Sequence, residues 1–332
     1  MAEALPSTAL FLLALSSMTM NRFLTFGLII LIAGCSEQLI QEKHEGMIDV
    51  PGGQIFYEMS NPNAAGTPLL LIHGGPGSTS CYFGLLDNLI TDRPVIRYDQ
   101  LDTGKSDRPG DRSRWVLSHF VEEIEAIRAA LDLKELHILG SSWGGTVAAE
   151  YGLVGNTNGL QSIILAGPLL STPKWMDDAQ ILVSQMPLDL QNVIRTHEAA
   201  GTYLDPAYIA ATDSFYARFL YHQPKKDVPE CEGVEGNSEM YNYMWGPTEF
   251  TATGTLLDYD RTDRLHELGM PVLLIAGEFD EARPATMEEF SNLIPNSEVQ
   301  ILPDAGHVGM VDKPGEYATF VNTYLAKIES QQ

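Results

Sequence analysis

The sequence predicts an α/β fold with a mostly parallel sheet, and three observations support this prediction. Short apolar segments rich in Val, Ile and Leu have the composition of buried strands. They alternate with stretches of helical periodicity, such as Ser118–Leu131. The strand rhythm stops between Leu169 and about Leu268 and then resumes. The predicted strands are Gln54–Met59, Leu69–Ile72, Val95–Tyr98, Leu136–Leu139, Ser162–Ala166, Val272–Ala276 and Val299–Leu302.

The interruption of the strand pattern predicts an inserted helical cap after the sixth strand. A chain of 332 residues with 44% apolar content suits one core with a cap better than two independent domains. We therefore assign residues 35–168 and 269–332 to the core, and residues 169–268 to the cap. A cap excludes water and shapes the pocket, so selectivity is expected there. Its aromatic residues, including Tyr241 and Trp245, either line an apolar pocket or form the cap's own core.

The most informative segment is Leu136–Gly145, where an apolar strand runs into the turn GSSWG and continues as helix-forming residues. This strand-turn-helix pattern presents Ser142 as a nucleophile on a strained backbone, which requires small neighbours. The helix that follows would direct its amide groups toward charge developing near Ser142. An ordinary strand-to-helix turn is the alternative interpretation.

A serine nucleophile at such a turn needs an acid and a histidine from later strand ends, in that order. The strand ending at Ala276 is followed by GEFDE, which contains Asp280, and the strand ending at Leu302 is followed by PDAGH, which contains His307. We expect His307 to remove the Ser142 proton and Asp280 to orient the imidazole.

A glycine-rich loop, HGGPG at residues 73–77, follows the predicted strand Leu69–Ile72. Glycines allow backbone amides to approach a tetrahedral oxyanion closely. The predicted oxyanion hole is the N–H of Gly75 together with that of Trp143, the residue after the nucleophile. A Gly-Pro-Gly cluster is otherwise simply a loop.

Taken together, HGGPG, GSSWGG, GEFDE and DAGH resemble the proline iminopeptidase family of serine hydrolases, which includes the tricorn-interacting aminopeptidases. The resemblance covers roughly Gly46 to Ala326 and implies the α/β-hydrolase fold. The segment Tyr98–Asp107 is similar to the family's YDQ-x-G-x-G-x-S motif, but Asp102 stands where the family usually has Gly.

The family resemblance also implies a site for the substrate's amino group. Met244–Phe250 resembles the family's M-x-G-P-x-E-F stretch, so Glu249 and Glu281 take the positions of the two glutamates that hold the amine. Two carboxylates around one ammonium form strong charge-assisted bonds in a partly dry pocket. Without the resemblance, two solvated carboxylates would be the simpler interpretation.

The expected function is therefore a serine aminopeptidase that releases an N-terminal residue, with proline as one candidate, from short peptides through an acyl-enzyme. An amino-acid amidase, an esterase or a lactonase using the same triad is an alternative, and so is a non-catalytic surface binding protein. We expect no cofactor and no metal, because the sequence contains neither H-E-x-x-H nor paired C-x-x-C motifs. The P-loop-like TGKS at 103–106 lacks the first glycine, whose position Asp99 occupies.

The N-terminal residues 1–34 are predicted to be a lipoprotein-type signal peptide. Phe23–Ala33 is an apolar run too short to span a membrane, and it follows Arg22 and precedes Gly34-Cys35. The sequence IAGC is similar to a bacterial lipobox, which would make Cys35 the lipid attachment site. The implied location is the bacterial cell envelope, in the outer membrane facing the periplasm. An uncleaved anchor helix is the alternative.

The charge balance excludes some partners. With 44 acidic and 20 basic residues the formal net charge is −24, which would repel nucleic acid and anionic lipid surfaces. Membrane attachment would therefore depend on acyl chains. No protein partner is implied. The two remaining cysteines, Cys81 and Cys231, could pair in an oxidising periplasm, but the sequence does not give their separation.

Overall fold

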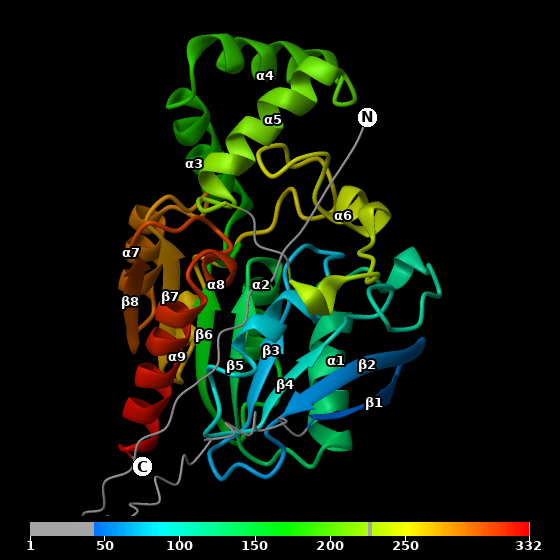
Figure 1. Ribbon diagram of the computed structural model, residues 1–332, viewed down its shortest axis with the longest axis vertical. Coiled ribbons are helices and arrows are strands. Elements are labelled where there is room, and N and C mark those ends of the chain that lie inside the picture. The colour runs from blue at the N-terminus through cyan, green and yellow to red at the C-terminus, as the bar shows by residue number, and fades with distance from the viewer. Residues whose placement is uncertain (1–42, 225–227, 332) are drawn as a thin grey trace, which may run out of the picture. The chain divides into compact units, whose positions relative to one another are not determined.

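The computed structural model describes residues 43–224 and 228–331, so the predicted signal peptide and Cys35 lie outside the described residues. In this part of the chain one eight-stranded sheet has the order β1-β2-β4-β3-β5-β6-β7-β8 (Figure 1). β2 pairs antiparallel with β1 and β4, and all other neighbours are parallel. The prediction of a mostly parallel sheet is confirmed. The strands are β1 (Lys43–Val50), β2 (Gly53–Ser60), β3 (Leu69–Ile72), β4 (Val95–Tyr98), β5 (Leu136–Ser141), β6 (Leu160–Ala166), β7 (Val272–Gly277) and β8 (Ser297–Leu302).

Each of the seven predicted strands corresponds to an observed strand, with ends that differ by a few residues at most. The sequence analysis missed β1. Its sequence KHEGMIDV is mostly polar because β1 is an edge strand, and only Ile48 and Val50 are buried. It pairs with β2 through a tight turn at Pro51 and Gly52, and Gly52 has φ +106°.

Helices cover both faces of the sheet, which explains why its central strands are apolar throughout. In β3, Leu70 and Ile72 belong to the core under α1, α2 and α7, whereas Leu69 and Leu71 belong to the core under α9 and η1. The bounds are α1 (Leu117–Ala130), α2 (Trp143–Val154), α7 (Pro284–Leu293), α8 (Gly309–Asp312), α9 (Pro314–Glu329), η1 (Ser80–Leu86), η2 (Arg112–Arg114) and η4 (Leu265–Glu267).

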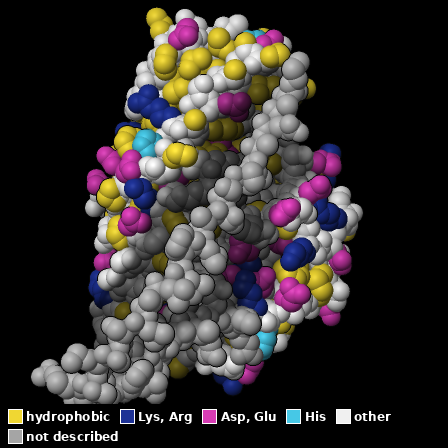
Figure 2. Space-filling model, in the orientation of Figure 1, with side chains coloured by type: hydrophobic (Ala, Val, Ile, Leu, Met, Phe, Trp, Pro, Cys, Tyr) yellow, Lys and Arg dark blue, Asp and Glu magenta, His cyan; other side chains and the backbone are white. Residues whose placement is uncertain are grey.

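The chain between β6 and β7 forms a helical cap above the carboxyl ends of the strands (Figure 1). Its helices are α3 (Thr172–Ser184), α4 (Leu188–Ala200), α5 (Pro206–Phe219), η3 (Pro229–Cys231) and α6 (Ser238–Met244). The cap has its own small core, in which Leu182, Ile194 and Phe215 are buried. It also exposes apolar side chains such as Leu188 and Leu204, and hydrophobic atoms gather over it in Figure 2.

A disulfide bond joins Cys81 in η1 to Cys231 in η3, with their Cα atoms 5.0 Å apart. Cys81 and Cys231 are thus paired in the structure, a question that the sequence left open. Across the described ranges, no helix combines the length and apolar character needed to cross a bilayer.

Candidate active site

Ser142 lies in a sharp turn between β5 and α2. Its φ of +56° and ψ of −120° place a non-glycine residue in a strained backbone region. The turn is held by a 2.7 Å bond from the Ser142 N–H to the Ala166 carbonyl. A Cβ on Gly140 would collide with the Gly144 carbonyl, and one on Gly144 would collide with the Ile72 carbonyl. These contacts explain why both sides of the serine require glycine.

Asp280 and His307 meet at the ends of β7 and β8. The Oδ1 of Asp280 accepts a 2.7 Å hydrogen bond from His307 Nδ1, and both side chains are buried. The N–H groups of Ala282 and Gly277 also donate to the Asp280 carboxylate, at 2.7 and 3.1 Å. These bonds fix the carboxylate, and the carboxylate in turn selects the tautomer with the proton on Nδ1.

The other ring nitrogen of His307 is Nε2. His307 and Ser142 line one cavity of about 560 Å³. The Nε2 atom is buried and has no hydrogen-bond partner among the described residues. The structure thus brings Ser142 and His307 to one cavity, and Asp280 bonds the imidazole through Nδ1. The geometry allows Nε2 to accept the serine proton when substrate excludes water from the cavity.

The two predicted oxyanion donors border the same serine. Trp143 is the first residue of α2, so its N–H has no intrahelical acceptor. Gly75 has φ +116°, which only glycine adopts without strain. Its neighbour Gly74 lies so close to the nucleophile that a side-chain Cβ on it would be only 3.1 Å from Ser142 Cβ. The HGGPG loop therefore passes directly beside the nucleophile.

Two residues that the sequence analysis did not assign, His73 and Gln100, hold this loop in place. Gln100 donates its backbone N–H to His73 Nε2 at 3.1 Å and its side-chain amide to the His73 carbonyl at 3.0 Å. Its Oε1 accepts a 3.1 Å bond from Trp143 Nε1. Both residues lie inside the HGGPG and YDQ motifs, so motif membership was the signal available for finding them.

Glu249 and Glu281 lie together beside His307. Glu281 is 3% exposed, its Oε1 is 3.9 Å from His307 Nε2, and neither of its oxygens has a hydrogen-bond partner in the described part of the chain. Burial raises the pKa of Glu249, and burial together with the charge of Glu249 raises the pKa of Glu281 well above its usual value. Burial therefore favours the protonated form of this carboxyl pair, and a bound cation would stabilise its ionised form.

These carboxylates also act on the histidine. Burial alone would lower the pKa of His307, but Asp280, followed by Glu281 and Glu249, outweighs it and raises this pKa to about 9. The neighbouring carboxylates therefore favour the protonated form of the imidazole.

The cap fixes Glu249 through its backbone rather than through its carboxylate. Trp175 Nε1 in α3 donates to the Glu249 carbonyl at 2.8 Å, and the Glu249 N–H donates to Tyr216 Oη in α5 at 3.3 Å. Trp245 Nε1 donates to the preceding carbonyl, that of Thr248, at 2.8 Å. Three aromatic side chains thus hold the loop that carries the glutamate, and the glutamate side chain lines both the large cavity and the narrow pocket described below.

A second, narrower pocket opens next to Ser142 and Glu249. Its remaining lining is mainly apolar and comes from both core and cap: Gly75, Pro76, Trp143, Leu169, Trp175 and Trp245. The sequence did not decide whether the aromatic cap residues line a pocket or form the cap's core. In the structure Trp245 lines this pocket and Tyr241 lines the larger cavity, whereas Phe215 belongs to the cap core.

Asp102, the departure from the family motif, has φ +70°, a conformation that explains why glycine is usual there. Its buried carboxylate accepts hydrogen bonds from Trp115 Nε1 at 2.8 Å and from the Gly110 N–H at 2.7 Å. In residues 43–224 and 228–331, no group of three or more His, Cys, Asp or Glu side chains is arranged to hold a metal ion.

Comparisons with known proteins agree on one family. Residues 67–314 match the family model of the alpha/beta hydrolase fold. The chain is 43% identical to a proline iminopeptidase of Heyndrickxia coagulans, over 86% of this chain and 99% of that protein. It is 36% identical to one of Lactiplantibacillus plantarum, over 83% and 98%. The crystal structure of the Mycobacterium smegmatis proline iminopeptidase superposes with a TM-score of 0.79 at 32% identity, covering 87% of this chain and 99% of that one. The chain therefore belongs to the proline iminopeptidase family of serine hydrolases with the α/β-hydrolase fold.

Proposed function

We propose that the protein is an aminopeptidase that releases N-terminal proline from short peptides through an acyl-enzyme. The observation that carries this proposal is the pair Glu249 and Glu281, a half-buried and a buried carboxyl group beside His307. Holding like charges close together away from water is costly, and the ammonium group of a protonated N-terminal amine, which is secondary in proline, would offset this cost. A free amino terminus is therefore the feature that the site selects.

The mechanism follows from the positions of the side chains. With the amine between Glu249 and Glu281, the scissile carbonyl reaches Ser142. The serine oxygen attacks the carbonyl carbon while His307 Nε2 takes the hydroxyl proton, and the N–H groups of Gly75 and Trp143 hold the oxyanion. His307 then gives that proton to the departing amine, and the C–N bond breaks. Water then attacks the acyl-enzyme by the same steps, with His307 taking its proton, and the amino acid is released from Ser142.

The substrate's charge also prepares the base. The neighbouring carboxylates raise the pKa of His307 to about 9, which favours the imidazolium at pH 7. A cation bound between Glu249 and Glu281 compensates two of these charges and lowers the pKa of His307 toward the range in which a base is neutral. Binding of the correct substrate thus favours the reactive form of the histidine.

The narrow pocket favours proline as the first residue. It lies between Ser142 and Glu249, and Trp143, Trp175 and Trp245 contribute flat apolar walls. The pocket has a volume of about 10 Å³, so its walls must move apart to admit a pyrrolidine ring, whose apolar surface suits them and whose rigidity lowers the entropy lost on binding.

A substrate panel tests the proposal. The purified protein is assayed with 4-nitroanilides of Pro, Ala, Leu and Phe, each with a free and an acetylated amine, and with 4-nitrophenyl acetate. We expect prolyl 4-nitroanilide to be preferred and acetylation to abolish its cleavage. Equal cleavage of acetylated substrates would indicate a plain amidase or esterase. A protein that neither turns over these substrates nor reacts with a fluorophosphonate at Ser142 would be a binding protein.

We further propose that the chain is exported and lipid-anchored at Cys35, in the outer membrane facing the periplasm. Two observations support this: the lipobox-like sequence IAGC and the Cys81–Cys231 disulfide, a bond that persists mainly in oxidising compartments. Globomycin, which blocks lipoprotein signal cleavage, should shift the protein to its precursor size in treated cells. Unchanged processing would overturn the lipid anchor.

A further inference from the structure

We name residues 231–238 the strap; its last four residues, 235–238, form one wall of the large cavity. The strap joins η3 to α6 and lies on the HGGPG loop and on the loop that follows β4. The Asn237 N–H donates to the Gly77 carbonyl at 2.6 Å, and the Gly104 N–H donates to the Glu235 carbonyl at 3.0 Å. Arg108 donates to the same Glu235 carbonyl. The strap is therefore held to the core mainly through its own backbone.

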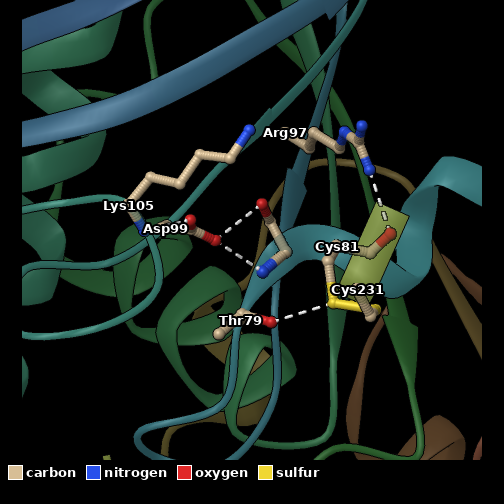
Figure 3. The surroundings of a disulfide bond; sticks show 7 residues. Thr79, Cys81, Arg97, Asp99, Lys105 and Cys231 are labelled. Atoms are coloured by element: carbon tan, nitrogen blue, oxygen red, sulfur yellow. Dashed lines mark hydrogen bonds between the residues drawn. A yellow bond between two sulfur atoms is a disulfide. The ribbon is translucent and has the colours of Figure 1, made fainter. Parts of the chain in front are cut away.

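The disulfide anchors the beginning of the strap to the start of η1, which several hydrogen bonds hold to the core (Figure 3). Arg97, from β4, donates to the Cys81 carbonyl at 3.0 Å. Asp99 accepts two 2.8 Å bonds from Ser80, the residue next to Cys81, and Thr79 donates to Cys81 Sγ at 3.0 Å. Cys81 thus belongs to a hydrogen-bonded frame at the start of η1, whereas Cys231 lies in a long connection between α5 and α6, whose described residues contain the short η3 as their one helical element.

The position of the strap relative to Ser142 identifies the part of the substrate that meets it. Ser142 and Glu249 line both cavities, so the amine and the scissile bond lie where the two cavities meet. Under the proposed function the first residue's side chain lies toward the narrow pocket. Strap residues Glu235 to Ser238 line only the larger cavity. The residues that follow the scissile bond are therefore left the larger cavity, where the strap forms one of the walls.

We propose that the Cys81–Cys231 disulfide is a positioning element for the leaving peptide, because it holds the strap as a fixed wall beside the departing residues. This inference rests on the proposed aminopeptidase activity and adds a determinant of substrate length to it. A fixed wall lowers the ordering cost of binding an extended peptide. A substrate whose leaving group is one small ring makes less contact with the strap than a peptide does, so its KM should depend less on the disulfide.

The test compares two substrates that share proline and differ in leaving group, prolyl 4-nitroanilide and the tetrapeptide Pro-Ala-Ala-Ala. The double variant Cys81→Ser/Cys231→Ser should show a KM for the tetrapeptide raised about fivefold, because the freed strap must be ordered on binding. Its kcat for both substrates and its KM for the nitroanilide should change less than about twofold. Thermal unfolding of each protein reports any general loss of stability separately.

Reduction of the wild-type protein provides a second route that needs no substitution. Treatment with tris(2-carboxyethyl)phosphine should raise the tetrapeptide KM, and reoxidation should restore it. The double variant in the same reductant is the matched control and should not respond, which excludes an effect at Cys35. Equal changes for both substrates, or no change for either, would overturn the positioning role. Absence of proline release from either substrate by the wild type would instead refute the aminopeptidase activity, and the inference with it.

Discussion

The core and the cap contribute to the site in different ways. Ser142, Asp280 and His307 each follow the carboxyl end of a core strand, and the His307 N–H also donates to the Phe219 carbonyl in cap helix α5 at 2.9 Å. Glu249 comes from the cap and is positioned by aromatic side chains from two other cap helices. The core thus supplies chemistry from rigid strand ends, whereas the cap supplies recognition through packing between separate helices. Variants of the two regions should therefore affect different kinetic constants.

Ser142→Ala should have the largest effect, because it removes the nucleophile from the core. We expect kcat for prolyl 4-nitroanilide to fall by about 10⁴-fold or more, while binding of a proline-containing inhibitor persists. Active-site titration with a fluorophosphonate checks that the remaining activity does not come from contaminating wild-type enzyme. Retention of full turnover would show that Ser142 is not the nucleophile and would refute the proposed mechanism.

Glu281→Gln and Glu249→Gln form a matched pair across the boundary between core and cap. Each substitution keeps the side-chain shape and removes one charge from the amine site. We expect kcat/KM for prolyl 4-nitroanilide to fall about 100-fold in either variant, because a buried ammonium loses one ionic partner. Hydrolysis of 4-nitrophenyl acetate, which has no amine, should change far less. An equal loss for both substrates would mean that these residues do not recognise the amine.

The pH dependence of kcat/KM tests how the two regions are coupled, because carboxylates of both the cap and the core raise the pKa of His307. His307 must be neutral to act as a base, and its pKa in the free protein is raised to about 9. The kcat/KM for 4-nitrophenyl acetate should therefore rise with pH up to about pH 9. In Glu281→Gln one carboxylate that raises this pKa is absent, so the rise should occur at lower pH. An unshifted profile would contradict the coupling.

The structure also shows which features the sequence could specify. The central strands and the order Ser142, Asp280, His307 were predictable because apolar runs and turn residues are local signals. β1 was missed because only two of its side chains reach the core. The pairing of Cys81 with Cys231 spans 150 residues and depends on how the loop before α6 packs on η1, which no local pattern reports. Glu249 was assigned through family resemblance alone for the same reason.

Trp175→Phe probes how strongly cap packing controls recognition. The substitution keeps an aromatic wall in the narrow pocket but removes the 2.8 Å hydrogen bond to the Glu249 carbonyl. A lost hydrogen bond of this kind costs about 1 kcal/mol, so kcat/KM for prolyl 4-nitroanilide should fall about fivefold. The loss should appear in KM, and 4-nitrophenyl acetate hydrolysis serves as the internal control for the core. A change confined to kcat would indicate that the tryptophan acts on the chemical step instead.

Asp102→Gly should have the smallest effect on catalysis and its main effect on stability. Glycine would relieve the strain of φ +70°, but it would leave the buried Trp115 Nε1 and the Gly110 N–H without their acceptor. An unsatisfied buried donor costs about 1–3 kcal/mol, which exceeds the strain that a single left-handed Asp stores, so the free energy of unfolding should decrease. Urea unfolding measures this change, with Asp102→Asn as a control that tolerates the same φ and keeps one acceptor oxygen. If glycine instead stabilised the protein, the two hydrogen bonds would be worth less than the strain, and the departure from the family motif would have no structural benefit.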